Sequence, residues 1–331
     1  MTQSPYAQLS RPVRLLAAGG TIAMSGERAV PALDAGQLID AVPGLGDVPQ
    51  LEAENVLGVP GPQMRPDQAL GLCRRARDAA AGGEGVVITT GTDTLEELAM
   101  LCALLHGGEA PIVLTGANRP ASRPGADGPA NLLDAVAVAG SARTGGLGSV
   151  VVFGGEIHAA CSVRKVDSTG PAAFGSPVAG PIGRVVEGRV WLHAIPAARP
   201  ATLDPQTLEF RVEIVTAALG EDGAQLRRAA ENGDGVVIAA FGAGHVTPGM
   251  IRELRALGDA KPVLVTCRPE RASMLFATYG FDGAEPDLRA TPAVGVPFLS
   301  PVAARIALLC GLGAGLDSQG LAQALSGFDA G

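Results

Sequence analysis

Short, continuous apolar runs recur along the chain, and they limit its fold more than any other feature. Each run holds four to six residues, ends in a loop of Gly, Thr or Ala, and is followed by a helical pattern. The runs occupy residues 13–18, 86–90, 112–115, 150–153, 236–240 and 263–266. Because such runs alternating with helices are typical of parallel strands buried on both faces, we predict an α/β fold with a mostly parallel sheet flanked by helices. Ligands of these sheets bind beyond the carboxyl ends of the strands, so chemistry is expected in the loops that follow the runs.

The helix expected after Thr90 has the clearest pattern. Apolar residues at positions 95, 98, 99, 102 and 105 follow the i, i+3, i+4, i+7 spacing of an amphipathic helix. Thr94 and Glu97 have the spacing of a capping box, so we expect the helix to begin there. The resulting strand–turn–helix unit places Gly91, Thr92 and Asp93 at a helix N-terminus, where free backbone N–H groups favour negative charge.

A segment near residue 200 divides the chain. Residues 195–212 are rich in Pro and carry little apolar periodicity, as expected of a linker between domains. We therefore predict a larger N-terminal domain over residues 1–197, a linker over residues 198–212, and a smaller C-terminal α/β domain over residues 213–331.

Composition and charge exclude several classes of protein. A hydrophobic fraction of 47% with 18% charged residues fits a well-buried globular enzyme and argues against disorder. The net charge is −8 and no basic stripe occurs, so we expect no nucleic-acid partner. No apolar run reaches the roughly 18 residues of a spanning helix, so no membrane association is expected either.

Cysteine and histidine usage argues against disulfides and metals. The five cysteines are widely spaced, with no C-x-x-C, and the N-terminus lacks the apolar stretch of a secretory signal. We therefore expect reduced, buried thiols in a cytoplasmic protein. No H-E-x-x-H motif, no complete G-x-G-x-x-G and no phosphate-binding loop occurs, so neither a metal nor a cofactor is expected.

Four polar segments stand out, and three of them end predicted strands. They are residues 19–23 (GGTIA), residues 90–94 (TGTDT), residues 116–120 with 126–132 (GANRP and ADGPANL), and residues 162–169 (SVRKVDST). Taken singly, each has an ordinary structural explanation: a Gly-Gly-Thr is usually a turn, and T-G-T-D serves as a helix cap. Their joint occurrence on a chain with this α/β pattern indicates an active site.

The residue types in these segments suit acyl transfer. A threonine hydroxyl such as that of Thr21 or Thr92 is a poor nucleophile until a base removes its proton. Lys165 is the candidate base if its surroundings favour the neutral amine, and Asp93 is a candidate to orient the lysine or to bind a substrate ammonium group. Glycines beside both threonines allow the backbone to approach a substrate closely and to offer N–H groups to an oxyanion.

These motifs resemble those of the bacterial-type L-asparaginases. The similarity rests on GGTIA at 19–23, TGTDT at 90–94, the block from 115 to 132 and Lys165, and it extends from about residue 13 to residue 309. It implies that Thr21 is the nucleophile that attacks the side-chain carboxamide of L-asparagine, with aspartate and ammonia as products. It also implies that Thr92 forms a triad with Lys165 and Asp93, and that Asp93 binds the substrate α-ammonium group.

The resemblance further implies a substrate-binding set and an oligomer. The set comprises Gly20, Gly61, Pro62, Gln63, Gly91, Asp93, Ala117, His245 and Glu285. Family members place a glutamate from the smaller domain of a neighbouring subunit into the site, and Glu285 is the matching residue. The expected assembly is therefore a homotetramer, a dimer of intimate dimers.

Three features depart from the family pattern. The loop after the first threonine lacks the usual tyrosine, since Tyr6 and Tyr279 are the only tyrosines in the chain. A serine expected to hold the substrate α-carboxylate is missing from the segment that begins at Gly61, and His245 stands where an asparagine is usual. Tyr279 near Glu285 is one candidate replacement for the missing tyrosine; ordinary packing is the alternative.

Two other functions remain open from the sequence. One is an amidase on the same fold that acts on glutamine or another carboxamide. The other is a non-catalytic amino-acid-binding protein, which the missing tyrosine and serine favour. Retention of both threonines with Lys165 argues for catalysis, because a binding protein needs no nucleophile with a base.

Overall fold

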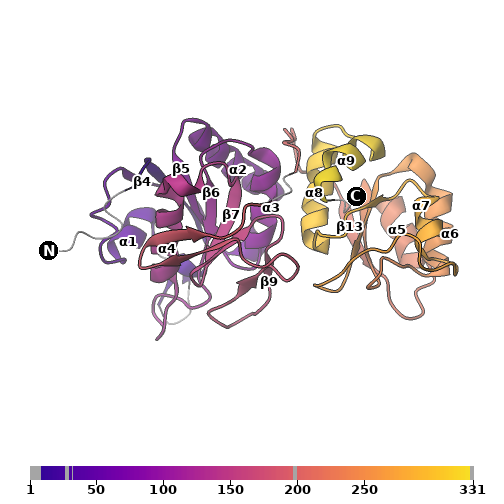
Figure 1. Ribbon diagram of the computed structural model, residues 1–331, viewed down its shortest axis with the longest axis horizontal. Coiled ribbons are helices and arrows are strands. Elements are labelled where there is room, and N and C mark those ends of the chain that lie inside the picture. The colour runs from indigo at the N-terminus through magenta and orange to yellow at the C-terminus, as the bar shows by residue number, and fades with distance from the viewer. Residues whose placement is uncertain (1–8, 27–29, 32, 197–199, 329–331) are drawn as a thin grey trace. The chain divides into compact units, whose positions relative to one another are not determined.

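The computed structural model describes residues 9–26, 30–31, 33–196 and 200–328. Backbone contacts divide the chain into two compact units, Met1–Ala197 and Ala198–Gly331. Figure 1 shows that each unit is a sheet covered by helices. The predicted fold class, a larger mostly parallel α/β domain followed by a smaller α/β domain, is therefore confirmed.

An eight-stranded sheet forms the centre of the first unit. Its strands are β4 (Leu51–Val59), β1 (Val13–Gly19), β5 (Gly85–Thr89), β6 (Ile112–Thr115), β7 (Ser149–Phe153), β8 (Glu156–Ala159), β11 (Gly183–Val186) and β12 (Arg189–Leu192). The order in space is β12-β11-β8-β7-β6-β5-β1-β4. Strands β4, β1, β5, β6 and β7 pair in parallel, and the remaining pairs are antiparallel.

Helices cover both faces of this sheet, as Figure 1 shows. They are α1 (Ala35–Asp40), α2 (Pro66–Ala81), α3 (Leu95–Leu105) and α4 (Gly128–Gly140). Helices α2 and α3 pack together, and α4 lies against β5, β6 and β7. Shorter elements complete the unit: β2 (Met24–Ser25) with β3 (Val30–Pro31), β9 (Arg164–Lys165) with β10 (Phe174–Gly175), and the 3₁₀ turns η2 (Thr21–Ala23), η3 (Gly61–Gln63) and η4 (Ala142–Thr144).

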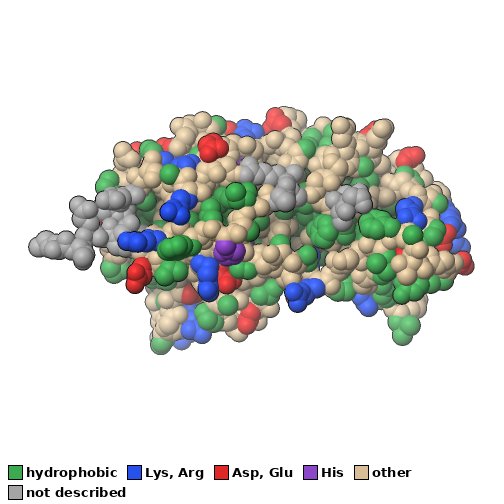
Figure 2. Space-filling model, in the orientation of Figure 1, with side chains coloured by type: hydrophobic (Ala, Val, Ile, Leu, Met, Phe, Trp, Pro, Cys, Tyr) green, Lys and Arg blue, Asp and Glu red, His purple; other side chains and the backbone are tan. Residues whose placement is uncertain are grey.

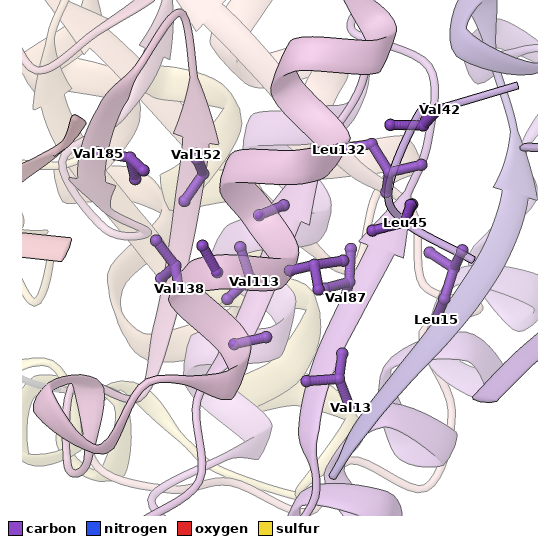
Figure 3. Packing of buried hydrophobic residues seen from close by; sticks show 14 of the residues in the cluster. Val13, Leu15, Val42, Leu45, Val87, Val113, Leu132, Val138, Val152 and Val185 are labelled. Atoms are coloured by element: carbon purple, nitrogen blue, oxygen red, sulfur yellow. The ribbon is translucent and has the colours of Figure 1, made fainter. Parts of the chain in front are cut away.

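The core beneath α4 is built from aliphatic side chains. Leu132 and Val138 of the helix meet Val87, Val113 and Val152 of three successive parallel strands in one buried cluster (Figure 3). Each such side chain contributes about 1.5–3 kcal/mol when it is fully removed from water. This packing fixes the strands, and it thereby fixes the loops at their carboxyl ends.

The second unit is a smaller sheet with helices. Its strands are β13 (Val212–Thr216), β14 (Gly235–Ala240), β15 (Val263–Cys267) and β16 (Val294–Gly295), which pair in parallel in that order. Its helices are α5 (Ala224–Asn232), α6 (Pro248–Leu257), α7 (Glu285–Arg289), α8 (Pro301–Gly313) and α9 (Ser318–Ala324), with 3₁₀ turns η5 (Gly258–Ala260) and η6 (Ser326–Phe328). Helices α5 and α6 pack together, and α8 packs against β13, β14 and β15.

All six strands predicted from apolar runs are confirmed within a residue at each end. The predicted capping box of α3 is wrong. Thr94 is the N-cap residue, but its side chain makes no capping hydrogen bond and its hydroxyl has no partner among the described residues. Its ψ of 7° departs from the extended conformation usual at an N-cap, so the hydroxyl does not face the first turn of the helix.

None of the five cysteines forms a disulfide, and all five lie in the described part of the chain. Four are buried, Cys161 is half-buried, and Sγ of Cys102 lies 3.1 Å from Sγ of Cys73. On the face shown in Figure 2, basic and acidic side chains are interspersed rather than gathered into a basic stripe. Within the described ranges, no helix is both long enough and apolar enough to cross a membrane.

Candidate active site

Close backbone contacts bring the first two sequence motifs together with the segment that begins at Gly61. The loops after β4, β1 and β5 follow neighbouring parallel strands, so they emerge at the same edge of the sheet. At Gly20 an added Cβ would lie 2.2 Å from the backbone nitrogen of Gly91. At Gly91 it would lie 2.8 Å from the backbone nitrogen of Gly61. Only glycine permits such approaches, so these residues seat the loop of Thr21 against the loop of Thr92.

Lys165 links the two polar groups of the second motif. Its Nζ donates to Thr92 Oγ1 at 3.0 Å and to Asp93 Oδ1 at 2.6 Å. Thr92 is 6% exposed and the Lys165 side chain 19%, whereas the Asp93 side chain is 61% exposed. The lysine therefore joins a buried hydroxyl on one side to a carboxylate that solvent or a ligand reaches on the other.

Thr21 begins the turn η2 directly after two glycines in the left-handed region, Gly19 at φ 89° and Gly20 at φ 80°. It is half-buried, and no hydrogen bond joins its hydroxyl to another described residue. The loop after it, residues 24–31, falls partly outside the described residues, at 27–29. What replaces the missing tyrosine therefore stays a hypothesis.

A polar network holds the segment that carries Lys165. The Asp127 carboxylate accepts hydrogen bonds from the backbone N–H groups of Asn118 and Arg119 at 2.8–3.1 Å. Asn118 Nδ2 in turn donates to the backbone oxygen of Gly170, and Gly170 N donates to Asp167. The third and fourth sequence motifs are thus connected to each other.

One charged residue next to the site escapes the sequence analysis. Glu96, in the first turn of α3, is half-buried, and its Oε2 is fully buried without a hydrogen-bond partner in the described chain. Burial raises the pKa of Glu96 to about 7, although the Arg164 guanidinium and the backbone N–H of Lys165 act in the opposite direction. Nothing in the helical periodicity distinguishes Glu96 from a solvated helix residue.

His245 and Glu285 meet within the second unit. His245 Nε2 lies 3.6 Å from Glu285 Oε2, and the rings of Tyr279 and Phe281 stand edge-on to the imidazole at 5.1 and 4.9 Å. Glu285 is 4% exposed, and it accepts hydrogen bonds from the backbone N–H groups of Thr278 and Tyr279 at 3.4 and 3.3 Å. Its removal from water acts to raise the pKa of Glu285, but the backbone donors and the nearby His245 outweigh this and lower it.

Comparison with known proteins identifies the family. The model of the asparaginase N-terminal domain matches residues 12–197, and that of the glutaminase/asparaginase C-terminal domain matches residues 211–325. The chain belongs to the bacterial-type L-asparaginase family. It is accordingly an enzyme of the asparaginase-type amidohydrolase class.

Individual members of the family align over almost the whole chain. A probable L-asparaginase of Deinococcus radiodurans is 38% identical over 92% of this chain and 94% of its own. L-asparaginase 2 of Bacillus subtilis is 30% identical over 91% of this chain and 82% of its own. The crystal structure of a probable cytoplasmic L-asparaginase from Campylobacter jejuni covers 96% of this chain and 99% of its own, with a TM-score of 0.81 at 27% identity.

The remaining residues expected at this asparaginase-family site differ in whether their side chains are exposed to solvent. Pro62 and Gln63 of η3 are exposed, whereas the glycines at 20, 61 and 91 are buried and offer only backbone. Ala117 is 0% exposed and belongs to the core cluster, so its side chain is not presented to a ligand. Among the described residues, no group of three or more His, Cys, Asp or Glu side chains is arranged to hold a metal ion.

Proposed function

We propose that this enzyme hydrolyses the side-chain carboxamide of L-asparagine to L-aspartate and ammonia through a threonine acyl-enzyme. The proposal is carried by one observation, the placement of Lys165 Nζ within hydrogen-bonding distance of both Thr92 and Asp93, beside a loop that presents Thr21. A base, an orienting carboxylate and two hydroxyls are the groups that acyl transfer requires.

Thr21 is proposed to form the covalent bond. Its hydroxyl has no partner in the described chain and is half-buried, which leaves it open to a substrate carbonyl. Attack by Oγ1 on the carboxamide carbon gives a tetrahedral intermediate. Its collapse breaks the C–N bond, releases ammonia and leaves an ester on Thr21. Water then attacks the ester, aspartate leaves, and the hydroxyl is restored.

Thr92, Lys165 and Asp93 are proposed to move the protons. In the first step a neutral Lys165 amine accepts the proton of the nucleophile through the Thr92 hydroxyl and returns it to the nitrogen that leaves as ammonia. In the second step it accepts a proton from the hydrolytic water and returns it to the Thr21 oxygen. Asp93 orients the lysine and, because it is the most exposed of the three, also binds the substrate α-ammonium group. Gly20, Gly61, Pro62, Gln63, Gly91 and Ala117 are proposed to surround the substrate, in several cases through their backbone.

Ammonia release by the purified protein tests this function. L-asparagine is compared with L-glutamine and D-asparagine, and the wild type with Thr21→Ala and Thr92→Val. We expect release from L-asparagine that falls by about 1,000-fold or more in both variants. Mass spectrometry of the slow Thr92→Val variant with asparagine is expected to find the ester on the peptide that contains Thr21.

Two results would contradict the proposal. Full turnover in both variants would remove the threonines from the mechanism. Thermal stabilisation by L-asparagine without any ammonia release from the wild type would favour an amino-acid-binding protein.

We further propose a homotetramer, a dimer of dimers, in which Glu285 and His245 of one subunit complete the site of a neighbour. In support, Glu285 accepts hydrogen bonds from two backbone donors, and aromatic side chains pack against the neighbouring His245. Phe276, Tyr279 and Phe281 are 45–52% exposed, which is unusual for large apolar side chains and typical of a contact surface.

We also propose a cytoplasmic location. Its support is the absence of a disulfide among the five cysteines, all of which lie in the described chain, and the likeness to the probable cytoplasmic enzyme of Campylobacter jejuni. A relative in Haemophilus influenzae, 32% identical over 89% of this chain, is named a probable periplasmic L-asparaginase. Cell fractionation followed by activity measurement distinguishes the two locations.

A further inference from the structure

Glu96 is a carboxyl group in a place where burial opposes its charge. It sits in the first turn of α3, the helix that begins directly after the turn of Thr92 and Asp93. Its Oε2 is buried without a partner in the described chain, and a buried, unpaired acceptor destabilises a protein. Glutamine would fill nearly the same volume without the charge, so what the Glu96 carboxylate contributes depends on the groups around it.

What surrounds Glu96 is the segment that holds the proposed base. The charged groups that act on its carboxyl are Arg164 and Lys165 of β9 and Glu97 of its own helix, and the backbone N–H of Lys165 also faces it. Strand β9 has only two residues and pairs only with the equally short β10. Such a short strand has little rigidity on its own. A contact from the buried helix α3 therefore helps to fix the position of Lys165.

We propose that Glu96 is a positioning residue, which fixes the backbone of Lys165 so that Nζ stays in contact with Thr92 and Asp93. The ionised carboxylate attracts the Lys165 N–H and the Arg164 guanidinium, and protonation releases both. The 3.0 Å contact from Nζ to Thr92 Oγ1 depends on this anchor, because a displacement of about 1 Å is enough to break such a hydrogen bond and to slow catalysis. The inference rests on the proposed roles of Thr92 and Lys165.

Because burial raises the pKa of Glu96 to about 7, its ionisation is expected to change kcat within the measurable pH range. We expect kcat of the wild type to rise with pH, with a midpoint near 7. Glu96 does not touch the substrate in this proposal, so KM is expected to be independent of the same group.

The test compares Glu96→Gln with Glu97→Gln, a matched change one residue along the same helix. In each, kcat and KM for L-asparagine are measured from about pH 5.5 to about pH 9. We expect Glu96→Gln to lose the rise near pH 7 and to lower kcat about 10-fold above it, with KM changed less than about two-fold. Glu97→Gln removes a negative charge that raises the pKa of Glu96, so it is expected to keep the rise in kcat and to move its midpoint to lower pH.

A purely structural role would give a different pattern. Thermal unfolding measured in parallel is expected to show Glu96→Gln no less stable than the wild type. A raised carboxyl pKa destabilises the folded state as pH rises above the unfolded value near 4.5, and the effect is complete above about 7. Relative to the wild type, the stability of Glu96→Gln should therefore increase over that window, whereas its kcat relative to the wild type should decrease as the pH rises.

Several outcomes would overturn the inference. Wild-type kcat with an unchanged pH profile in Glu96→Gln would do so, as would a rise in KM at unchanged kcat. If Glu96→Gln does not fold, Glu96→Asp retains the charge one methylene further from β9. It should lower kcat while keeping the rise near pH 7, and wild-type kcat in this variant would contradict the proposal.

One further variant separates this inference from the proposed function. Lys165→Met is expected to abolish turnover. If it remains active, the proposed role of Lys165 fails, and that of Glu96 fails with it. If Lys165→Met is inactive but Glu96→Gln is unchanged, only the inference about Glu96 fails.

Discussion

At the scale of single residues, the site depends on where side chains are absent. Gly20 has φ 80°, in the left-handed region that favours glycine. It also lies so close to the backbone of Gly91 that no side chain fits. The loop of Thr21 approaches the loop of Thr92 only because of this contact. A methyl group at position 20 is therefore expected to reduce catalysis, although it removes no catalytic atom.

Gly20→Ala is predicted to reduce asparaginase activity about 100-fold or more. Its control is Gly44→Ala, at φ 82°, where an added Cβ meets nothing within 4 Å. Both variants carry the left-handed penalty of roughly 1–2 kcal/mol. Only Gly20→Ala adds overpacking, of about 1–3 kcal/mol. Urea unfolding and ammonia release measure both effects, and equal behaviour of the two variants would contradict the role given to the contact.

At the scale of elements, the loop after β6 is held by a carboxylate in addition to the packing of Ala117 in the core. Asp127 is the N-cap residue of α4, but its side chain does not cap the helix. It bonds instead to the backbone N–H groups of Asn118 and Arg119. The connection continues to Gly170, so this carboxylate also supports the segment of Lys165.

Asp127→Ala is therefore predicted to destabilise the protein by about 3 kcal/mol, since two backbone donors lose a charged acceptor. Asp127→Asn keeps one acceptor oxygen and should cost about half as much. Chemical denaturation gives both values. A loss below about 0.5 kcal/mol in Asp127→Ala would show that water replaces the carboxylate at no cost.

Elements differ in how visible they are in the sequence. The six strands found from apolar runs are buried on both faces, so almost every residue in them except Arg14 is buried and most are apolar. Strand β4 escapes this pattern because it lies at the edge of the sheet, and most of its residues are half-buried or exposed. The antiparallel strands β8, β11 and β12 are short and partly exposed, so they too carry little signal.

The candidate site follows the same logic. Thr92, Asp93 and Lys165 stand in motifs with a chemical meaning, and the structure brings them into hydrogen-bonding contact. The capping role expected of Thr94 was wrong, because a local spacing rule cannot register the approach of Gly61 to that residue. Glu96 was missed, since the burial of one carboxyl group depends on a strand about 70 residues away.

At the scale of the whole molecule, the proposed assembly makes each site the product of two chains. Thr21 and Thr92 belong to one unit of the chain, and Glu285 belongs to the other. A subunit that is defective in one unit is then able to support a neighbour that is defective in the other.

Subunit mixing tests this directly. Thr21→Ala and Glu285→Gln proteins, each of low activity alone, are unfolded, mixed in equal amounts and refolded. Half of the dimers are hybrids with one intact site of two, so about one quarter of wild-type activity should return. Mixing Thr21→Ala with Thr92→Val is the control, since both changes lie in the same unit, and it should restore nothing. No recovery in the first mixture would place Glu285 outside a shared site.

The strand order of the large sheet has a consequence for the chain during its synthesis. Of the described strands, β1 comes first in the sequence, yet it lies between β4 and β5, which pair with it from both sides. Until residue 89 has emerged, this strand, which is apolar apart from Arg14, keeps at least one open edge. Parallel pairing over such separations is slow, and open strand edges recruit other chains. The strand order that assembles the catalytic loops at one edge thus leaves β1, during synthesis, with an open edge on which another chain can pair.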